Sequence, residues 1–263
     1  MGRKGHTAKH GGHRDTHHLT GHRDPLPGID SLQWKDGAPH RKGQDEFDYG
    51  KITEELGDMT ETSAPRARYH HGNLRVALLE AAEAELVDKG LEAFSLRSVA
   101  ARAGVTHTAP KPHFGNTEGL LTALCALGFR RLVEVQDHAK AAAAADPVAQ
   151  LEAAGLGYIA FATSNQALFR LMFASNRPNF SDQDLSQAAR RAFAALETDV
   201  AQARRSKGCD QDDDALAVAS AWATAHGLAD LLSSGRLRAL STMESNRRDE
   251  MAARVLSNSA LSV

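Results

Sequence analysis

Residues 95–121 restrict the fold of this 263-residue chain more than any other segment. The segment reads SLRSVAARAGVTHTAPKPHFGNTEGLL and opens with apolar residues at the i, i+3, i+4 and i+7 spacing of one helix face. Ser95 precedes this stripe and can cap the helix with its hydroxyl, and Gly104 follows it, where glycine accommodates a left-handed backbone. The sequence therefore predicts a short helix between these two residues, with an apolar face made of Leu96, Val99, Ala100 and Ala103.

A second short helix is expected directly after this turn. Thr106 can cap it, and the apolar side chain of Val105 is expected to fill the angle between the two helices. A turn of three or four residues with glycine between two helices is typical of a helix-turn-helix, which places its second helix in the major groove of DNA. Glycine also ends helices at ordinary helical corners, so this segment alone leaves a plain helical corner as the alternative.

Two more helices are expected on either side of this pair. Upstream, apolar residues at helical spacing end at Gly90, and downstream Asn116 can cap a long helix. The upstream helix carries Leu74, Leu78, Ala81, Ala82, Glu85 and Leu86, and the downstream helix carries Leu120, Leu121, Leu124 and Leu127.

The combination of these runs resembles the DNA-binding domain of the TetR/AcrR transcriptional regulators. The matching strings, between about Tyr69 and Phe129, are LLEAAEAELVDKG, SLRSVAARAGV, the pair His113-Phe114 and TEGLL. The resemblance implies an all-α chain, in which a three-helix helix-turn-helix DNA-binding domain precedes a helical ligand-binding and dimerisation domain. The expected divisions are an N-terminal extension over residues 1–65, the DNA-binding domain over 66–130 and the regulatory domain over 131–258.

The chain departs from the family pattern at two positions that typically contact DNA phosphates. Family members usually carry a tyrosine where this chain has Lys111 and a lysine where it has Thr117. Lys111 can still offer a cation to a phosphate, and Thr117 offers a hydroxyl beside a helix N-terminus, which favours anions. Pro110 and Pro112 each remove a backbone donor, so the recognition helix is expected to be short and partly irregular.

The residues expected to contact DNA lie in or just before this domain. His107, Thr108 and Lys111 are the candidates that face the groove, whereas Ala109 is expected to pack inward. Arg68 belongs to a basic arm that can reach the DNA backbone or the minor groove, and a solvated linker is the alternative for that arm. The net charge of −2 does not oppose DNA binding, because what matters is the local cluster of cations. The candidate DNA-binding residues are Arg68, Arg97, Thr106, His107, Thr108, Lys111, His113 and Thr117.

The first 58 residues have a different composition, rich in His, Gly, Arg, Lys and Asp and without apolar periodicity. We expect a disordered tail; the alternative is a metal-binding arm, because imidazoles suit zinc, nickel or copper. Met59 begins a string that looks like a natural family start, so residues 1–58 are also open to interpretation as an over-extended gene model. The histidines of the loose tract are His6, His10, His13, His17, His18 and His22.

Beyond Arg130 the sequence predicts further helices, with starts near Asp146-Pro147, Gln166, Asp182, Asp212 and Met243. The resemblance implies that two subunits pair through the last two long helices, over residues 212–233 and 243–256. It also implies that a small apolar effector enters the regulatory domain, although plain core packing explains the same side chains equally well. The tentative pocket residues are Phe161, Phe169, Met172, Phe173, Phe193, Trp222 and His226, of which Trp222 and His226 with Gly227 also match one TetR subgroup.

Other function classes find little support in the sequence. No HExxH, GxSxG, GxGxxG or P-loop string occurs, so we expect no enzyme, no cofactor and no defined metal site. We find no signal-peptide pattern and expect no apolar stretch near the ~20 residues that span a bilayer. The distant Cys125 and Cys209 favour a reduced, cytoplasmic protein.

The sequence thus predicts a dimeric, ligand-responsive regulator, most often a repressor in this family, that binds a palindromic operator in double-stranded DNA. A metal-responsive regulator or metal-binding protein using the His-rich arm is the alternative.

Overall fold

The computed structural model describes residues 1–2, 74–209 and 211–261. Predictions that fall on residues 3–73, namely Arg68 with its basic arm, the histidine tract and the start at Met59, lie outside the described residues. All regular secondary structure in the described part of the chain is helical, which confirms the predicted all-α fold.

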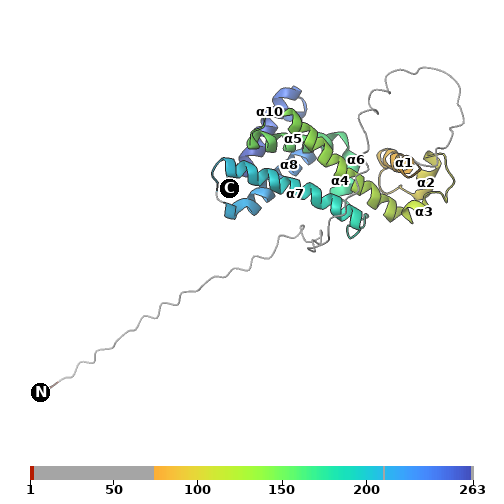
Figure 1. The fold of residues 1–263 in the computed structure, drawn as a ribbon, viewed down its shortest axis with the longest axis horizontal. Helices are drawn as coiled ribbons and strands as arrows, with labels where there is room; N and C mark the ends of the chain where they lie inside the picture. The colour runs from red at the N-terminus through yellow and green to blue at the C-terminus, as the bar shows by residue number, and fades with distance from the viewer. Residues whose placement is uncertain (3–73, 210, 262–263) are drawn as a thin grey trace. The chain divides into compact units, whose positions relative to one another are not determined.

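The first helices form what we call the head, which comprises α1, α2, α3 and the first turns of α4 (Figure 1). Ser95 caps α2 as predicted, with its side-chain oxygen accepting from the Ser98 N–H at 3.2 Å. Gly104 follows α2 with a φ of 69°, the left-handed conformation expected of a glycine at a helix C-terminus. The bounds are α1 Leu74–Lys89, α2 Leu96–Arg102, α3 Lys111–Phe114 and α4 Thr117–Ala142.

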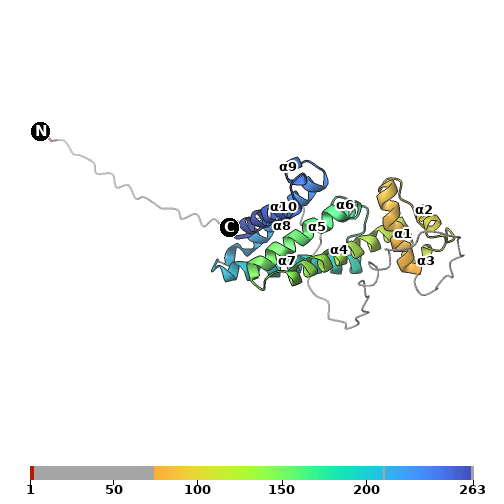
Figure 2. The same ribbon diagram turned by 90° about the horizontal axis from the view of Figure 1, so that it is seen from above.

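The remaining helices form the regulatory part, in which α4 packs against α5 and α7, while α8 and α10 pack against each other and against α5. Both ribbon views place α8 and α10 at the end of the bundle away from α1, α2 and α3 (Figure 2). The bounds are α5 Pro147–Ser164, α6 Gln166–Phe173, α7 Gln183–Ser206, the short 3-10 helix η1 Gln211–Asp213, α8 Asp214–Ser233, α9 Arg238–Ser241 and α10 Ser245–Leu261.

Capping residues set the starts of the regulatory helices where the sequence predicted them. Asp146 accepts from the N–H groups of Val148 and Ala149 ahead of α5, and Asp182 accepts from the Leu185 N–H ahead of α7. The last long helix, α10, covers Ser245–Leu261 and so ends beyond the predicted residues 243–256, and the short helix α9 precedes it. The predicted boundary between residues 130 and 131 falls inside the continuous α4 and stays a prediction.

A buried arginine joins three helices of the regulatory part. Arg204 on α7 is fully buried; its Nε donates to Asp214 Oδ1 at 2.8 Å and its Nη1 to the Ala260 carbonyl at 3.3 Å. Because a buried charge is costly unless it is paired, this arrangement fixes the start of α8 and the end of α10 relative to α7.

The expectation that no apolar stretch approaches bilayer length is corrected at α8. This 20-residue helix is long and apolar enough, by length and composition, to cross a membrane. Core helices often meet the same criterion, and α8 packs on α5 and α10. However, only 28% of its apolar window is buried, and Leu216 and Leu231 on this helix are exposed.

Candidate nucleic-acid interface

The recognition segment, residues 106–114, contains only one turn of regular helix. Helix α3 has four residues, and the backbone before it forms turns in which the Ala109 N–H donates to the Thr106 carbonyl at 3.0 Å and the Lys111 N–H to the Thr108 carbonyl at 3.2 Å. Pro110 and Pro112 have no N–H to continue an i to i−4 ladder. The prediction of a short and partly irregular recognition helix is therefore confirmed.

The predicted capping role of Thr106 is wrong. Its hydroxyl lies 3.2 Å from the hydroxyl of Thr108, and the residue that precedes α3 is Pro110, without a side-chain capping bond. The physical reason is the proline pair, since the first regular turn can form only around and after Pro110, four residues beyond Thr106. Both threonine side chains are exposed.

The segment presents polar and cationic side chains to solvent. Arg97 and Lys111 are exposed and form no ion pair within the described part of the chain. Ala109 and Thr117 are half-buried, so Ala109 is more buried than the exposed Thr108 before it, while Pro110 after it is buried. The exposed candidates are Arg97, Thr106, His107, Thr108, Lys111 and His113.

A tight turn places the N-terminus of α4 directly after α3. Gly115 has a φ of 71°, and the Asn116 side chain accepts from the Gly119 N–H at 2.8 Å. A Cβ at Gly119 would lie 2.0 Å from the Phe114 carbonyl oxygen, so only glycine permits this close approach. The turn leaves Thr117 in the first turn of a 26-residue helix, where backbone N–H groups favour an anion such as a phosphate.

Phe114 anchors the recognition segment in the core. Its ring is buried, and the Arg75 guanidinium lies 5.4 Å from the ring centroid. Arg75 is exposed at the start of α1 and adds a cation to this part of the DNA-binding domain. The sequence did not single it out as a site residue, since its place beside Phe114 depends on the packing of α1 against the recognition segment.

An ion-pair network holds α1 against α2. Glu85 is only 1% exposed and lies 2.7 Å from Lys89 Nζ and 2.9 Å from Arg102 Nε, while Arg102 also reaches Asp88 at 2.5 Å. The hydrogen bond from Lys89, together with that from Arg102, outweighs burial and lowers the pKa of Glu85 to about 2. This carboxylate thus stays charged and holds α1 against α2, the helix that precedes the recognition segment.

Comparisons with known proteins match both parts of the chain. The profile of the family described as bacterial regulatory proteins, tetR family, matches residues 78–124, and that of the tetracyclin repressor-like C-terminal domain matches residues 151–258. The chain belongs to the TetR family of transcriptional regulators. A comparison with curated proteins gave no significant match.

Solved structures share the fold of this TetR-family chain. A protein of unknown function from Rhodococcus sp. RHA1 is 29% identical with a TM-score of 0.63, over 73% of this chain and 97% of that one. A TetR-like transcriptional regulator from the same organism is 16% identical (TM-score 0.52; 74% and 97% covered). The fatty acid degradation regulator FadR from Bacillus halodurans is 14% identical (TM-score 0.56; 70% and 94% covered).

The tentative effector residues together with Tyr158 make up what we call the aromatic cluster of the regulatory part, in which Phe169, Phe173 and Trp222 lie around one polar pair. Tyr158 Oη lies 2.8 Å from His226 Nδ1, and the His226 ring centroid lies 5.2 Å from that of Phe169 and 5.3 Å from that of Phe173. Trp222 also contacts this group and stacks edge-on with Phe193 at 6.1 Å. Phe161 and Met172 are buried in the same core. Tyr158 was missed, since one tyrosine in an apolar helix carries no sequence signal.

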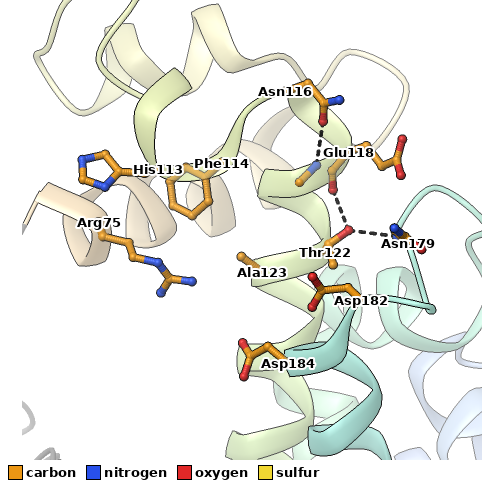
Figure 3. A pocket seen from close by; sticks show the side chains of 11 residues that line it. Arg75, His113, Phe114, Asn116, Glu118, Thr122, Ala123, Asn179, Asp182 and Asp184 are labelled. Carbon is orange, nitrogen blue, oxygen red and sulfur yellow. Dashed lines mark hydrogen bonds between the residues drawn. The ribbon is translucent and has the colours of Figure 1, made fainter.

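A separate pocket of about 300 Å³ lies between the head and the chain that joins α6 to α7 (Figure 3). Arg75, His113 and Phe114 form one side of it, and Asp182 and Asp184 lie on the other. Asp184 is paired with Arg130 at 2.8 Å. None of the tentative effector residues lines this pocket, so the head and the aromatic cluster are separate places in the fold.

Proposed function

We propose that this TetR-family protein is a ligand-responsive repressor that binds a palindromic operator as a homodimer. The observation that carries the proposal is the exposed recognition segment, in which Lys111 forms no ion pair with the described residues and lies shortly before the N-terminus of α4. Unpaired cations and a free helix N-terminus bind phosphates, whereas exposed polar side chains in the groove read bases. His107 and Thr108 are the proposed base readers, and Arg97, Lys111, His113 and Thr117 are proposed phosphate contacts. Thr106 lies at the edge of this surface.

Dimerisation through α8 and α10 is supported by where apolar side chains are exposed. Leu216 is 56% exposed and Leu231 36% exposed on α8, and Met251 is 41% and Val255 45% exposed on α10. Exposed apolar side chains on two helices that pack against each other are typical of an interface. A two-fold dimer buries this surface and pairs two heads with the two halves of a palindrome.

Effector binding is assigned to the aromatic cluster of the regulatory part. A small, largely apolar molecule suits Phe161, Phe169, Met172, Phe173, Phe193 and Trp222, and the Tyr158–His226 pair supplies one polar contact. Such a molecule separates helices α5, α6 and α8 and changes the spacing of the two heads, so that DNA is released. The proposed place of action is the cytoplasm, where the operator is accessible.

The metal-responsive alternative depends on the histidine tract, which lies outside the described residues. Within residues 74–209 and 211–261, no group of three or more His, Cys, Asp or Glu side chains is arranged to hold a metal ion. The described part of the chain therefore adds no support to that alternative.

A gel-shift assay of the full chain with the intergenic DNA upstream of its own gene tests the proposal. We expect retardation at low salt that weakens steeply as salt rises, because phosphate contacts release counterions. A matched control fragment of random sequence is expected to bind at least tenfold more weakly. No retardation at low salt, with or without a cell extract to supply a co-ligand, would contradict the proposal.

A further inference from the structure

The chain that joins α6 to α7, residues 174–182, contacts the head at two separate places. Arg177 Nη1 donates to the Leu91 carbonyl oxygen, which lies in the turn between α1 and α2. The backbone N–H of Asn179 donates to Thr122 Oγ1 on α4 at 2.9 Å, and the Thr122 hydroxyl donates to the Glu118 carbonyl at 2.8 Å (Figure 3). One connection is therefore hydrogen-bonded both to the segment before α2 and to the start of α4.

Both contacts are partly buried, and hydrogen bonds within the connection hold its backbone. Thr122 is 5% exposed and Arg177 is half-buried, whereas Asn179 is exposed but donates through its backbone to the buried Thr122 hydroxyl, so water competes only in part for these hydrogen bonds. The connection is itself fixed, because the Arg177 N–H donates to Ser175 Oγ at 3.1 Å and the Asp182 N–H to the Asn179 carbonyl at 3.0 Å. A displacement at one end of the connection is thus carried along it and is not absorbed by loose backbone.

The other end of the connection begins where α6 ends, and α6 carries three of the tentative effector residues. Phe169, Met172 and Phe173 lie on this eight-residue helix. It packs so closely on α4 that a Cβ at Gly128 would lie 2.5 Å from Met172 Sδ. Because α6 packs this closely on α4, a molecule that enters among these side chains is expected to displace α6.

We propose that the Arg177–Leu91 and Asn179–Thr122 hydrogen bonds form a two-point clamp that makes the head follow α6. Leu91 precedes α2 and Thr122 follows the first turn of α4, so the clamp holds the chain on both sides of the recognition segment. The Arg131 guanidinium, 2.6 Å from Glu83, ties α4 to α1 and keeps the two held points in one rigid unit. Arg177 and Thr122 are positioning residues, and this inference rests on the proposed DNA-binding function.

The clamp can be tested before any effector is known, because coupling between two sites is reciprocal. If α6 moves the head, DNA bound to the head must alter α6. Hydrogen–deuterium exchange of the full chain is measured with and without the upstream DNA fragment that is retarded in the gel shift. In the unmodified protein, DNA is expected to change exchange in peptides that cover residues 166–173.

Two clamp variants and one control complete the experiment. Arg177→Ala and Thr122→Val each remove one side of a clamp hydrogen bond, and Arg170→Ala removes an exposed arginine of α6. At saturating DNA we expect the change over residues 166–173 to fall by at least half in each clamp variant and to persist in Arg170→Ala. Circular dichroism checks folding; if Arg177→Ala does not fold, Thr122→Val decides the result.

The outcomes separate the two proposals. An unmodified protein that binds DNA without any exchange change in α6 would overturn the clamp, and so would clamp variants that transmit the change in full. An unmodified protein that binds no DNA would instead overturn the proposed function.

Discussion

Tyr158 and His226 lie 68 residues apart in the sequence, yet Tyr158 Oη is 2.8 Å from His226 Nδ1 and so joins α5 to α8. Burial lowers the pKa of His226, with Asp230 partly opposing this shift, and burial raises the pKa of Tyr158. Both groups are thus neutral near pH 7, and one uncharged hydrogen bond links the tyrosine hydroxyl to the imidazole nitrogen. The pair is the polar centre of an otherwise aromatic cluster.

Removing the Tyr158 hydroxyl tests how much the Tyr158–His226 hydrogen bond contributes to the stability of the fold. Tyr158→Phe leaves His226 Nδ1 without its hydrogen-bond partner among aromatic side chains, which costs about 1–3 kcal/mol. We expect that decrease in the free energy of unfolding measured by urea titration. Thr198→Val is the control, because the exposed Thr198 hydroxyl donates to the Ala194 carbonyl of its own helix and has no other hydrogen bond among the described residues. An equal decrease in both variants would contradict the importance of the pair.

Lys111 provides a test of phosphate binding. Lys111→Ala is expected to weaken binding about equally for all DNA sequences, because a cation on a phosphate carries no base information. The slope of log affinity against log salt is expected to fall by about 0.9 for each phosphate that is no longer neutralised, thus by about 2 for a dimer. Fluorescence anisotropy between 50 and 200 mM salt, roughly the range in which such slopes are resolved, measures this change.

The matched control for this prediction is Lys207→Ala, an exposed lysine after α7 and far along the chain from the head. Its salt slope should equal that of the unmodified protein. A Lys111→Ala variant that changes the preferred sequence but keeps the salt slope would show that Lys111 reads bases instead.

Glu85 predicts an acid-dependent loss of stability. Its pKa in the fold is about 2 against an ordinary value of 4.5, so it binds protons more weakly when folded than when unfolded. The stabilisation is therefore complete above about pH 5 and is lost as the pH falls from 4.5 toward 2. The difference in Tm between the unmodified protein and Glu85→Gln should be largest near pH 7 and shrink at low pH.

The control for the acid prediction is Glu197→Gln, since Glu197 is exposed within α7, away from its first turn, and forms no ion pair within the described residues. Its Tm should follow that of the unmodified protein at every pH. A difference for Glu85→Gln that is constant from pH 7 to pH 3 would contradict the role of the Glu85 charge.

The exposed apolar residues of α8 and α10 predict the dimer interface. Val255→Glu or Leu216→Glu places a carboxylate in a surface that the dimer buries, and an unpaired buried charge is strongly unfavourable. We expect analytical ultracentrifugation to show a shift from dimer to monomer. Val87→Glu is the control, because Val87 is 66% exposed on α1, outside this surface. If both interface variants remain dimeric, the prediction that α8 and α10 form the dimer interface is contradicted.

Much of the fold follows from local sequence signals. Ser95, Asn116, Asp146 and Asp182 start helices as predicted, because a side-chain cap acts on N–H groups two or three residues away. Thr106 looked like a cap of the same kind, and the prediction failed because Pro110 and Pro112 decide where α3 begins. Local patterns therefore predict helix starts well, except where a proline nearby overrides them.

The contacts that organise the sites are not local and escaped prediction. Arg177 lies 86 residues from Leu91, and Tyr158 lies 68 residues from His226. No spacing rule links such pairs, since they depend on how whole helices pack. The position of Arg75 over Phe114 has the same origin. The cationic residues of the recognition segment were identified from sequence and resemblance, whereas their scaffold became visible only in the fold.

The proposed function requires that the two heads of a dimer bind the two halves of one operator. Hydroxyl-radical footprinting of the full chain on the retarded upstream fragment tests this most directly. We predict two protected patches, related by two-fold symmetry and centred about one helical turn apart, ~34–36 Å. A single asymmetric patch, or protection that is uniform along the fragment, would contradict the proposed dimer on a palindrome.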